Sequence, residues 1–269
     1  MLKPTLLQVL FDKLDRLVNL GEHDKAALSA LPQHHKTIPT GDYIVREGTK
    51  PDHCAILLQG YAIRQKLSAD GKRQILAIQI AGDPLDAQHM FLDCADHNVQ
   101  ALGEARVAII PRHALQTVVM SRPALTHAFA VNGQIDASIF REWLLNIGRR
   151  DARKRLAHLF CEIAVRLETS GQSTADGFYL PMSQEELGDA TSLTSVHVNR
   201  SLRILEDDGF IARNGRTIQF PDKAATMKMA GFDPRYLHLG RQSDAVIAAS
   251  VLNGEPSRGA DDRYGGSDA

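Results

Sequence analysis

Residues 182–220 have the sequence MSQEELGDATSLTSVHVNRSLRILEDDGFIARNGRTIQF. Ser183 followed by Glu186 is a capping box, the S-x-x-E pattern with which a helix begins. A second helix fits residues 194–208, and it is followed by Asn214-Gly215, the strongest two-residue signal for a β-hairpin. The order of helix, short turn, helix and hairpin predicts a helix-turn-helix followed by a wing.

The second helix has two unlike faces. At about 100° per residue, Val198, Leu202 and Leu205 gather on one face, which can pack on the rest of its domain. The opposite face carries arginine, asparagine and small hydroxyl side chains. Arginine can bind guanine and asparagine adenine in the major groove, and N–H groups and hydroxyls at a helix start suit phosphate oxygens. The expected DNA-binding residues are Ser183, Gln184, Thr194, Ser195, Val196, His197, Asn199, Arg200 and Arg203, with Arg213 and Arg216 on the wing.

The chain as a whole gives no sign of its partner. It has 269 residues, 43% of them hydrophobic, and a net charge of −1, so an argument for nucleic acid must rest on this local basic surface. A polar helix face alone would favour an ordinary solvated surface, but the ordered combination of motifs favours DNA. No nucleophile–base pair, phosphate-binding glycine loop or metal-ligand spacing indicates an enzyme, so we expect no catalytic and no metal-binding residues.

The cellular location follows from cysteines and hydropathy. The three cysteines are far apart, which indicates a reducing compartment without a disulfide framework. The N-terminal residues are typical of an amphipathic helix rather than a signal peptide. No apolar run approaches the roughly 18 residues that cross a membrane. We therefore expect a cytoplasmic protein with no membrane partner.

The pattern of apolar and polar residues changes twice in the region before the helix-turn-helix. Residues 5–31 have helical periodicity with a break at Gly21, and 37–111 hold short apolar or alternating runs separated by turns. That spacing predicts an antiparallel sandwich or barrel, and RQKLSADGKRQILAI is its clearest hairpin. In a helix predicted over 123–148, an apolar stripe recurs. The stripe suits packing on the chain's own sheet and a subunit interface about equally.

Residues 182–211 resemble the winged helix-turn-helix of the Crp/Fnr family of bacterial transcription regulators, and GDYIVREGTKPDHCAILLQGYAIRQ, GKRQILAIQIAGD and VQALGEARVAIIPR resemble its cyclic-nucleotide-binding-like β-roll. The resemblance implies an α+β chain with a jelly-roll-like sensor domain (1–122), a dimerisation helix (123–148) and a winged helix-turn-helix domain (149–222). A tail (223–269) follows, for which we expect a short helix and then, from its Gly-, Asp- and Ser-rich composition, disorder. The resemblance also implies a homodimer on a pseudo-palindromic operator in double-stranded DNA. It leaves open whether RNA polymerase is a further partner. It tips the helical stripe toward a dimer interface formed by Ile135, Ile139, Phe140, Trp143 and Ile147.

Members that bind cyclic AMP have a Gly-Glu pair for the ribose and an arginine for the phosphate. Asp86-Ala87 and Ala95-Asp96 fall at those places in this sequence, and an aspartate there would repel a phosphate. We therefore expect a degenerate effector pocket and no control by cyclic AMP in the usual way. The family's oxygen sensors bind an iron–sulfur cluster through N-terminal cysteines, but no cysteine precedes Cys54.

No cofactor is expected from these residues, and two alternatives stay open. One is a regulator gated by an unidentified small ligand or by haem, for which His53-Cys54, His89 and Cys94 are candidate ligands without a distinctive spacing. The other is a nucleotide-binding regulatory subunit or an enzyme. In the recognition helix, Ser195-Val196 replace the family's Arg-Glu pair while Arg200 keeps the later arginine, so Arg200 is the expected guanine contact and Val196 a candidate for a thymine methyl.

Overall fold

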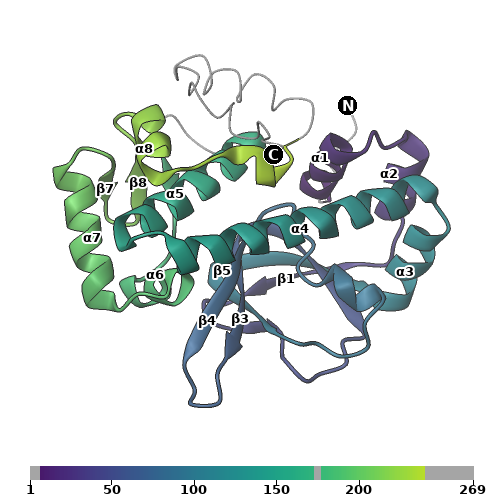
Figure 1. Cartoon of the computed structure of the whole chain (residues 1–269). Helices are drawn as coiled ribbons and strands as arrows, with labels where there is room; N and C mark the ends of the chain where they lie inside the picture. The colour runs from purple at the N-terminus through teal and green to yellow at the C-terminus, as the bar shows by residue number, and fades with distance from the viewer. Residues whose placement is uncertain (1–6, 173–176, 240–269) are drawn as a thin grey trace, which may run out of the picture.

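The computed structural model describes residues 7–172 and 177–239 (Figure 1). The first region contains α1 (Gln8–Leu17), α2 (Glu22–Ser29), β1 (His34–Ile38), β2 (Tyr43–Val45), β3 (His53–Leu67), β4 (Arg73–Ile80), η1 (Ala87–Met90), β5 (Asn98–Pro111) and α3 (Arg112–Met120). The second contains α4 (Pro123–Arg149), α5 (Ala152–Thr169), β6 (Phe178–Tyr179), α6 (Gln184–Thr191), α7 (Ser195–Asp207), β7 (Ala212–Asn214), β8 (Thr217–Gln219), α8 (Lys223–Ala230) and η2 (Pro234–Leu237).

The first region is built on one antiparallel sheet in the order β1-β5-β3-β4, with β2 also paired to β5. This confirms the predicted antiparallel β-sheet domain of an α+β chain. The segment CAILLQGYAIRQKL lies in the single long strand β3, whose register shifts on both sides of Gln59. Gly60 lies at this irregularity with φ +84°, and a Cβ there would come within 2.5 Å of the Glu104 carbonyl oxygen, so only glycine fits. The predicted hairpin is present, because Leu67 pairs with Arg73 across its loop.

One hydrophobic cluster joins the sheet to the second region. Ile63, Ile75 and Ile78 from the sheet belong to the same buried cluster as the apolar face of α5. Arg166 on α5 strengthens this contact, since it donates 2.9 Å to the Ile78 carbonyl and pairs with Asp83 at 3.0 Å. The packing therefore continues across the boundary expected near residue 149, and the sensor sheet lies directly on the helix-turn-helix domain.

Helix α4 runs along the molecule beside the sheet (Figure 1). Its expected dimer stripe needs a correction, because Ile135, Ile139 and Trp143 are only 7–9% exposed and pack in the chain's own core. The indole N–H of Trp143 donates to the buried Glu162 carboxylate at 3.0 Å. The remaining two residues of the expected interface are more open, with Phe140 exposed and Ile147 half-buried.

The tail expected over 223–269 begins with α8 and η2, and its remainder, 240–269, lies outside the described residues. Among the helices within 7–172 and 177–239, none combines the length and the apolar character needed to cross a membrane.

Candidate nucleic-acid interface

The helix-turn-helix begins with the predicted capping box. The Ser183 hydroxyl accepts a hydrogen bond from the Glu186 N–H at 3.2 Å, and the Glu186 carboxylate accepts one from the Ser183 N–H at 2.8 Å. The polar groups of Ser183 are therefore engaged in starting α6. Gln184 is exposed beside it and accepts a hydrogen bond from the Asn199 amide at 3.2 Å, so these two predicted DNA contacts support each other.

The turn between α6 and α7 is tight for two reasons. Gly188 lies so close to the following segment that a Cβ would come within 2.4 Å of the Leu193 carbonyl oxygen. Ser192 ends α6 in the left-handed region with φ 54°, a conformation that non-glycine residues rarely adopt. Thr194 then caps α7 by accepting a hydrogen bond from the His197 N–H at 3.3 Å.

The two predicted faces of α7 are both present. Val198, Leu202 and Leu205 are at most 1% exposed and anchor the helix to its domain. The opposite face carries the other predicted contacts, with Asn199 half-buried at its edge and the rest exposed: Ser195, Val196, His197, Arg200 and Arg203. Within 7–172 and 177–239, neither Arg200 nor Arg203 has an ion-pair or hydrogen-bond partner. Two unpaired guanidinium groups are therefore held on a rigid surface where they can contact bases or phosphates.

The wing differs in detail from its expected form. Asn214 pairs with Thr217, so the turn consists of Gly215 and Arg216 rather than of Asn214-Gly215. Arg216 is exposed, but Arg213 pairs with Glu206 of α7 at 2.6 Å, so its charge is compensated within the domain. Strand β6, which pairs with β8, was missed because two residues are too short for any alternating pattern.

The hairpin of β3 and β4, which we call the sensor hairpin, contacts α6 of the helix-turn-helix. Arg73 pairs with Asp189 at 2.7 Å, and the Gln74 amide donates to the Asp189 carbonyl at 2.6 Å. Sequence reasoning missed these residues, because a pair of residues more than 100 positions apart leaves no local signal. In Figure 1, α7 and the wing lie at the opposite end of the molecule from α1–α3, where a duplex can approach them.

The expected effector pocket is only partly assembled from its four predicted residues. Ala87 and Asp96 line one cavity of about 680 Å³ between the η1 segment and α4. Asp86 is instead buried and accepts a hydrogen bond from the Ala55 N–H at 2.8 Å, while Ala95 packs in the sheet core. Two of the four predicted residues therefore line the cavity, and other residues make most of its wall.

The candidate haem or metal ligands do not form a cluster. Cys54 and His89 are buried, Cys94 is exposed, and burial raises the pKa of the Cys54 thiol, with the nearby Asp86 carboxylate adding to it. In the part of the chain that the structure describes, no three histidine, cysteine or acidic side chains are placed to hold a metal ion.

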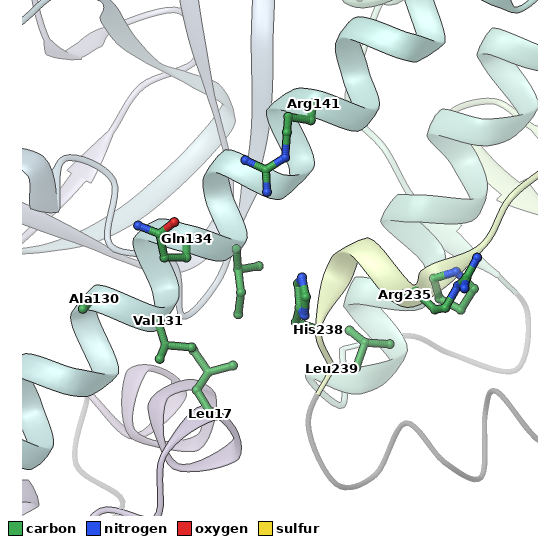
Figure 2. Close-up of a pocket in the computed structure, with 10 residues that line it drawn as sticks. Leu17, Ala130, Val131, Gln134, Arg141, Arg235, His238 and Leu239 are labelled. Atoms are coloured by element: carbon green, nitrogen blue, oxygen red, sulfur yellow. The ribbon is translucent and has the colours of Figure 1, made fainter.

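A second hollow, of about 640 Å³, opens between α1, α4 and η2 (Figure 2). Leu17 and Val131 line it from one side and His238 and Leu239 from the other, while Arg141 extends from α4 near its rim. Ile135, which was expected at the dimer interface, lines this hollow instead. None of the other predicted site residues belongs to it.

A sheet domain in contact with a winged helix-turn-helix defines a class of protein, the DNA-binding regulators that carry a sensor domain, and the comparisons agree. Residues 35–122 match the family model described as a cyclic nucleotide-binding domain, and 154–226 match that of the Crp-like helix-turn-helix domain. A probable transcriptional activator of Rhizobium leguminosarum is 28% identical over 75% of this chain and 84% of its own. The transcriptional activator protein FnrL of Cereibacter sphaeroides is 26% identical over 78% of this chain and 86% of its own.

The chain belongs to the Crp/Fnr family of DNA-binding transcription regulators. The solved structure of FixK2 from Bradyrhizobium japonicum has the same fold, with a TM-score of 0.66, 23% identity, and coverage of 74% of this chain and 97% of that one.

Proposed function

We propose that the protein regulates transcription as a homodimer whose two α7 helices enter successive major grooves of a pseudo-palindromic operator. One observation carries the proposal: Arg200 and Arg203 are exposed and unpaired within the described residues, on a helix that Val198, Leu202 and Leu205 lock in place. In dimers of helix-turn-helix proteins the two recognition helices lie about 34 Å apart, one turn of DNA. Arg200 contacts a guanine, and Val196, which is 76% exposed, is free to contact a thymine methyl.

The dimer interface in this proposal is a face of α4 that the fold leaves open. Gly133, Ala137, Phe140, Leu144 and Ile147 follow each other at alternate spacings of four and three, which is the a/d pattern of a coiled coil. Leu144 is 68% exposed and Phe140 39%, unlike the neighbouring stripe that the sheet and α5 cover. We name these five residues the α4 seam. It retains Phe140 and Ile147 of the interface expected from sequence.

A selection experiment tests the DNA-binding part. The full chain is used to select duplexes from a random pool, and a two-fold symmetric site with half-site centres about 10 base pairs apart is expected. Affinity for the selected site should fall steeply with salt, since binding releases counterions from the phosphates. An asymmetric site, or no enrichment at all, would contradict the proposal.

The sensor domain offers a second function, regulation by a small ligand, and the cavity beside α4 favours it. Nine residues of α4 line this cavity, and three of them, Gly133, Ala137 and Phe140, belong to the α4 seam. A bound ligand can thus bias how the helix is held. In this proposal the protein acts in the cytoplasm, RNA polymerase is a further partner, and no residue has a catalytic role.

A further inference from the structure

The cavity between the η1 segment and α4 has a size suited to a small molecule. Its volume of about 680 Å³ falls within the usual range for ligand sites, roughly 300–1,000 Å³. Large apolar side chains form much of its wall: Leu76, Met90, Phe91, Leu92, Phe129 and Phe140. Phe91 and Leu92 are 58% and 54% exposed, so two adjacent apolar side chains remain in contact with solvent beside the cavity. Such a surface favours an apolar guest.

Three of the lining residues carry a buried polar atom that has no hydrogen-bond partner within the described chain. These atoms are Asn132 Oδ1 from α4, Gln88 Nε2 from η1 and His97 Nε2 from the segment before β5. Asn132 is only 3% exposed. A buried polar group without a partner is destabilising, and three such groups on residues around one cavity suit a ligand that satisfies them.

The hydrogen-bonding roles of these atoms can be assigned. His97 Nδ1 lies 2.7 Å from the Asp96 carboxylate, so the ring N–H points to Asp96 and Nε2 keeps its lone pair. Burial lowers the pKa of His97 despite this contact, which keeps the ring uncharged at neutral pH. His97 Nε2 and Asn132 Oδ1 therefore accept hydrogen bonds, while Gln88 Nε2 donates one.

The two cations that line the cavity, Arg64 and Lys66, are already paired with carboxylates. Arg64 donates to Asp136 at 2.9 Å and to the Leu85 carbonyl at 3.1 Å, and Lys66 pairs with Glu47 at 3.0 Å. A phosphate or carboxylate entering the cavity would meet the Asp96 carboxylate and no unpaired cation among the described lining residues. The cavity therefore disfavours an anion.

We propose that this cavity binds an uncharged, largely apolar ring compound that carries at least one hydrogen-bond donor and one acceptor, in place of a cyclic nucleotide. The inference rests on the proposed function, since it gives the chemical class of the effector in the same sensor domain. The donor of the ligand reaches Asn132 or His97, its acceptor takes the Gln88 N–H, and its ring lies among the phenylalanines.

A matched pair of probes tests the charge preference on the full chain. 1-Naphthol and 1-naphthyl phosphate share one ring system but differ in charge, and their binding is followed by ligand fluorescence and by the unfolding midpoint. We expect 1-naphthol to saturate at one molecule per chain and to raise the midpoint, because it binds only the folded state. We expect 1-naphthyl phosphate and cyclic AMP to bind at least tenfold more weakly.

Variants test the assigned atoms. Asn132→Leu and Gln88→Leu should weaken 1-naphthol binding three- to tenfold and leave the midpoint of the unliganded protein unchanged or higher, since each removes an unpartnered polar atom. Asn199→Leu, on the DNA-binding surface, is the matched control and should bind 1-naphthol as the wild type does. An asparagine with a merely structural role would instead lower the unliganded midpoint when replaced.

Three results would overturn the inference: no binding of 1-naphthol, binding of either phosphate as tight as that of 1-naphthol, or equal 1-naphthol affinity in wild type, Asn132→Leu and Gln88→Leu. Binding to the selected duplex is measured on the same preparations. A protein that binds the duplex but not 1-naphthol refutes this inference alone, whereas one that binds no duplex refutes the proposed function.

Discussion

Arg73 of the sensor hairpin lies 2.7 Å from Asp189 of α6, so an ion pair joins the sensor domain directly to the first helix of the helix-turn-helix. Both side chains are about three-quarters buried, which shields the pair from solvent. The adjacent Gln74 binds the backbone of Asp189 as well, so the hairpin fixes α6 through both its side chain and its main chain. The hairpin therefore holds α6, on which the recognition helix α7 packs.

This contact predicts a measurable coupling between the two domains. A double-mutant cycle with Arg73→Ala and Asp189→Ala should give a coupling of about 1 kcal/mol in the free energy of unfolding by urea, at the upper end for partly exposed pairs. Lys72→Ala is the control, because its pair with Asp70 stays within the hairpin and is exposed, so it should cost less than about 0.5 kcal/mol. Additive single mutants would show that the two domains are not coupled here.

Arg200 should determine a base, whereas Arg216 should contribute only charge. Arg200→Ala is expected to cost about 1–3 kcal/mol on the selected duplex and to relax the preference at one base position per half-site. Arg216→Ala should weaken all duplexes alike and reduce the salt dependence by about one counterion. Anisotropy titrations on the selected site and on single-base variants separate the two effects. Equal weakening by Arg200→Ala on every duplex would assign Arg200 to a phosphate.

The α4 seam predicts that an aspartate substitution within it weakens the dimer, whereas one at another exposed aliphatic residue does not. Leu144→Asp should weaken dimerisation at least tenfold, about 1.4 kcal/mol or more, because the charge would be buried between two helices. Val196→Asp is the matched control, since Val196 is also an exposed aliphatic residue but lies on α7, and it should leave the dimer intact. Sedimentation equilibrium measures both.

A core variant separates the seam from the stripe expected from sequence. Ile139→Ala should lower the free energy of unfolding by about 2–5 kcal/mol, because Ile139 packs inside the chain, and should leave the dimer constant nearly unchanged. If Ile139→Ala dissociated the dimer without lowering the free energy of unfolding, Ile139 would belong to the dimer interface, as the sequence pattern predicted.

The sequence predicted most of this fold because the decisive signals are local. The capping box, the faces of α7 and the hairpin around Asp70-Gly71 each depend on residues a few positions apart. The face of α4 was harder to assign, since Ile139 and Phe140 are equally apolar and only the packing of α5 shows which one is covered. Nothing in the sequence indicated that Arg213 has an ion-pair partner, since Glu206 approaches it only in the folded domain.

Gly188 is expected to be essential for the geometry of the turn. Gly188→Ala would place a Cβ 2.4 Å from a backbone oxygen, so the turn must open, at a cost of about 1–3 kcal/mol and with loss of affinity for the duplex. Gly148→Ala, in α4, meets no atom within 4 Å and should be neutral or stabilising by about 0.5–1 kcal/mol. Thermal unfolding and anisotropy on both variants check this. If Gly188→Ala unfolds and binds like the wild type, the close approach has no energetic role.

Glu142 predicts how the protein responds to acid. The contact with His158, whose Nε2 lies 3.2 Å from a carboxylate oxygen of Glu142, is the largest cause that holds the pKa of Glu142 at about 2, against the opposing effect of burial, and Arg150 helps with a 2.6 Å ion pair. Since an unfolded glutamate titrates near pKa ~4.3, the unfolded chain takes up this proton first as pH falls. The stabilisation is therefore complete above about pH 5 and is lost as the pH falls toward 2. Glu142→Gln should lower the free energy of unfolding at pH 7 by about 1–3 kcal/mol and flatten its decline between pH 5 and 2.

Urea unfolding across this pH range measures the effect. Glu104→Gln, at an exposed position, is the control and should follow the wild-type curve. Because Glu142 is on α4 and His158 on α5, the acid-sensitive contact ties α4 to the DNA-binding domain, so duplex affinity corrected for unfolding should decline over the same range. Parallel curves for wild type and Glu142→Gln would show that other carboxylates control the acid response.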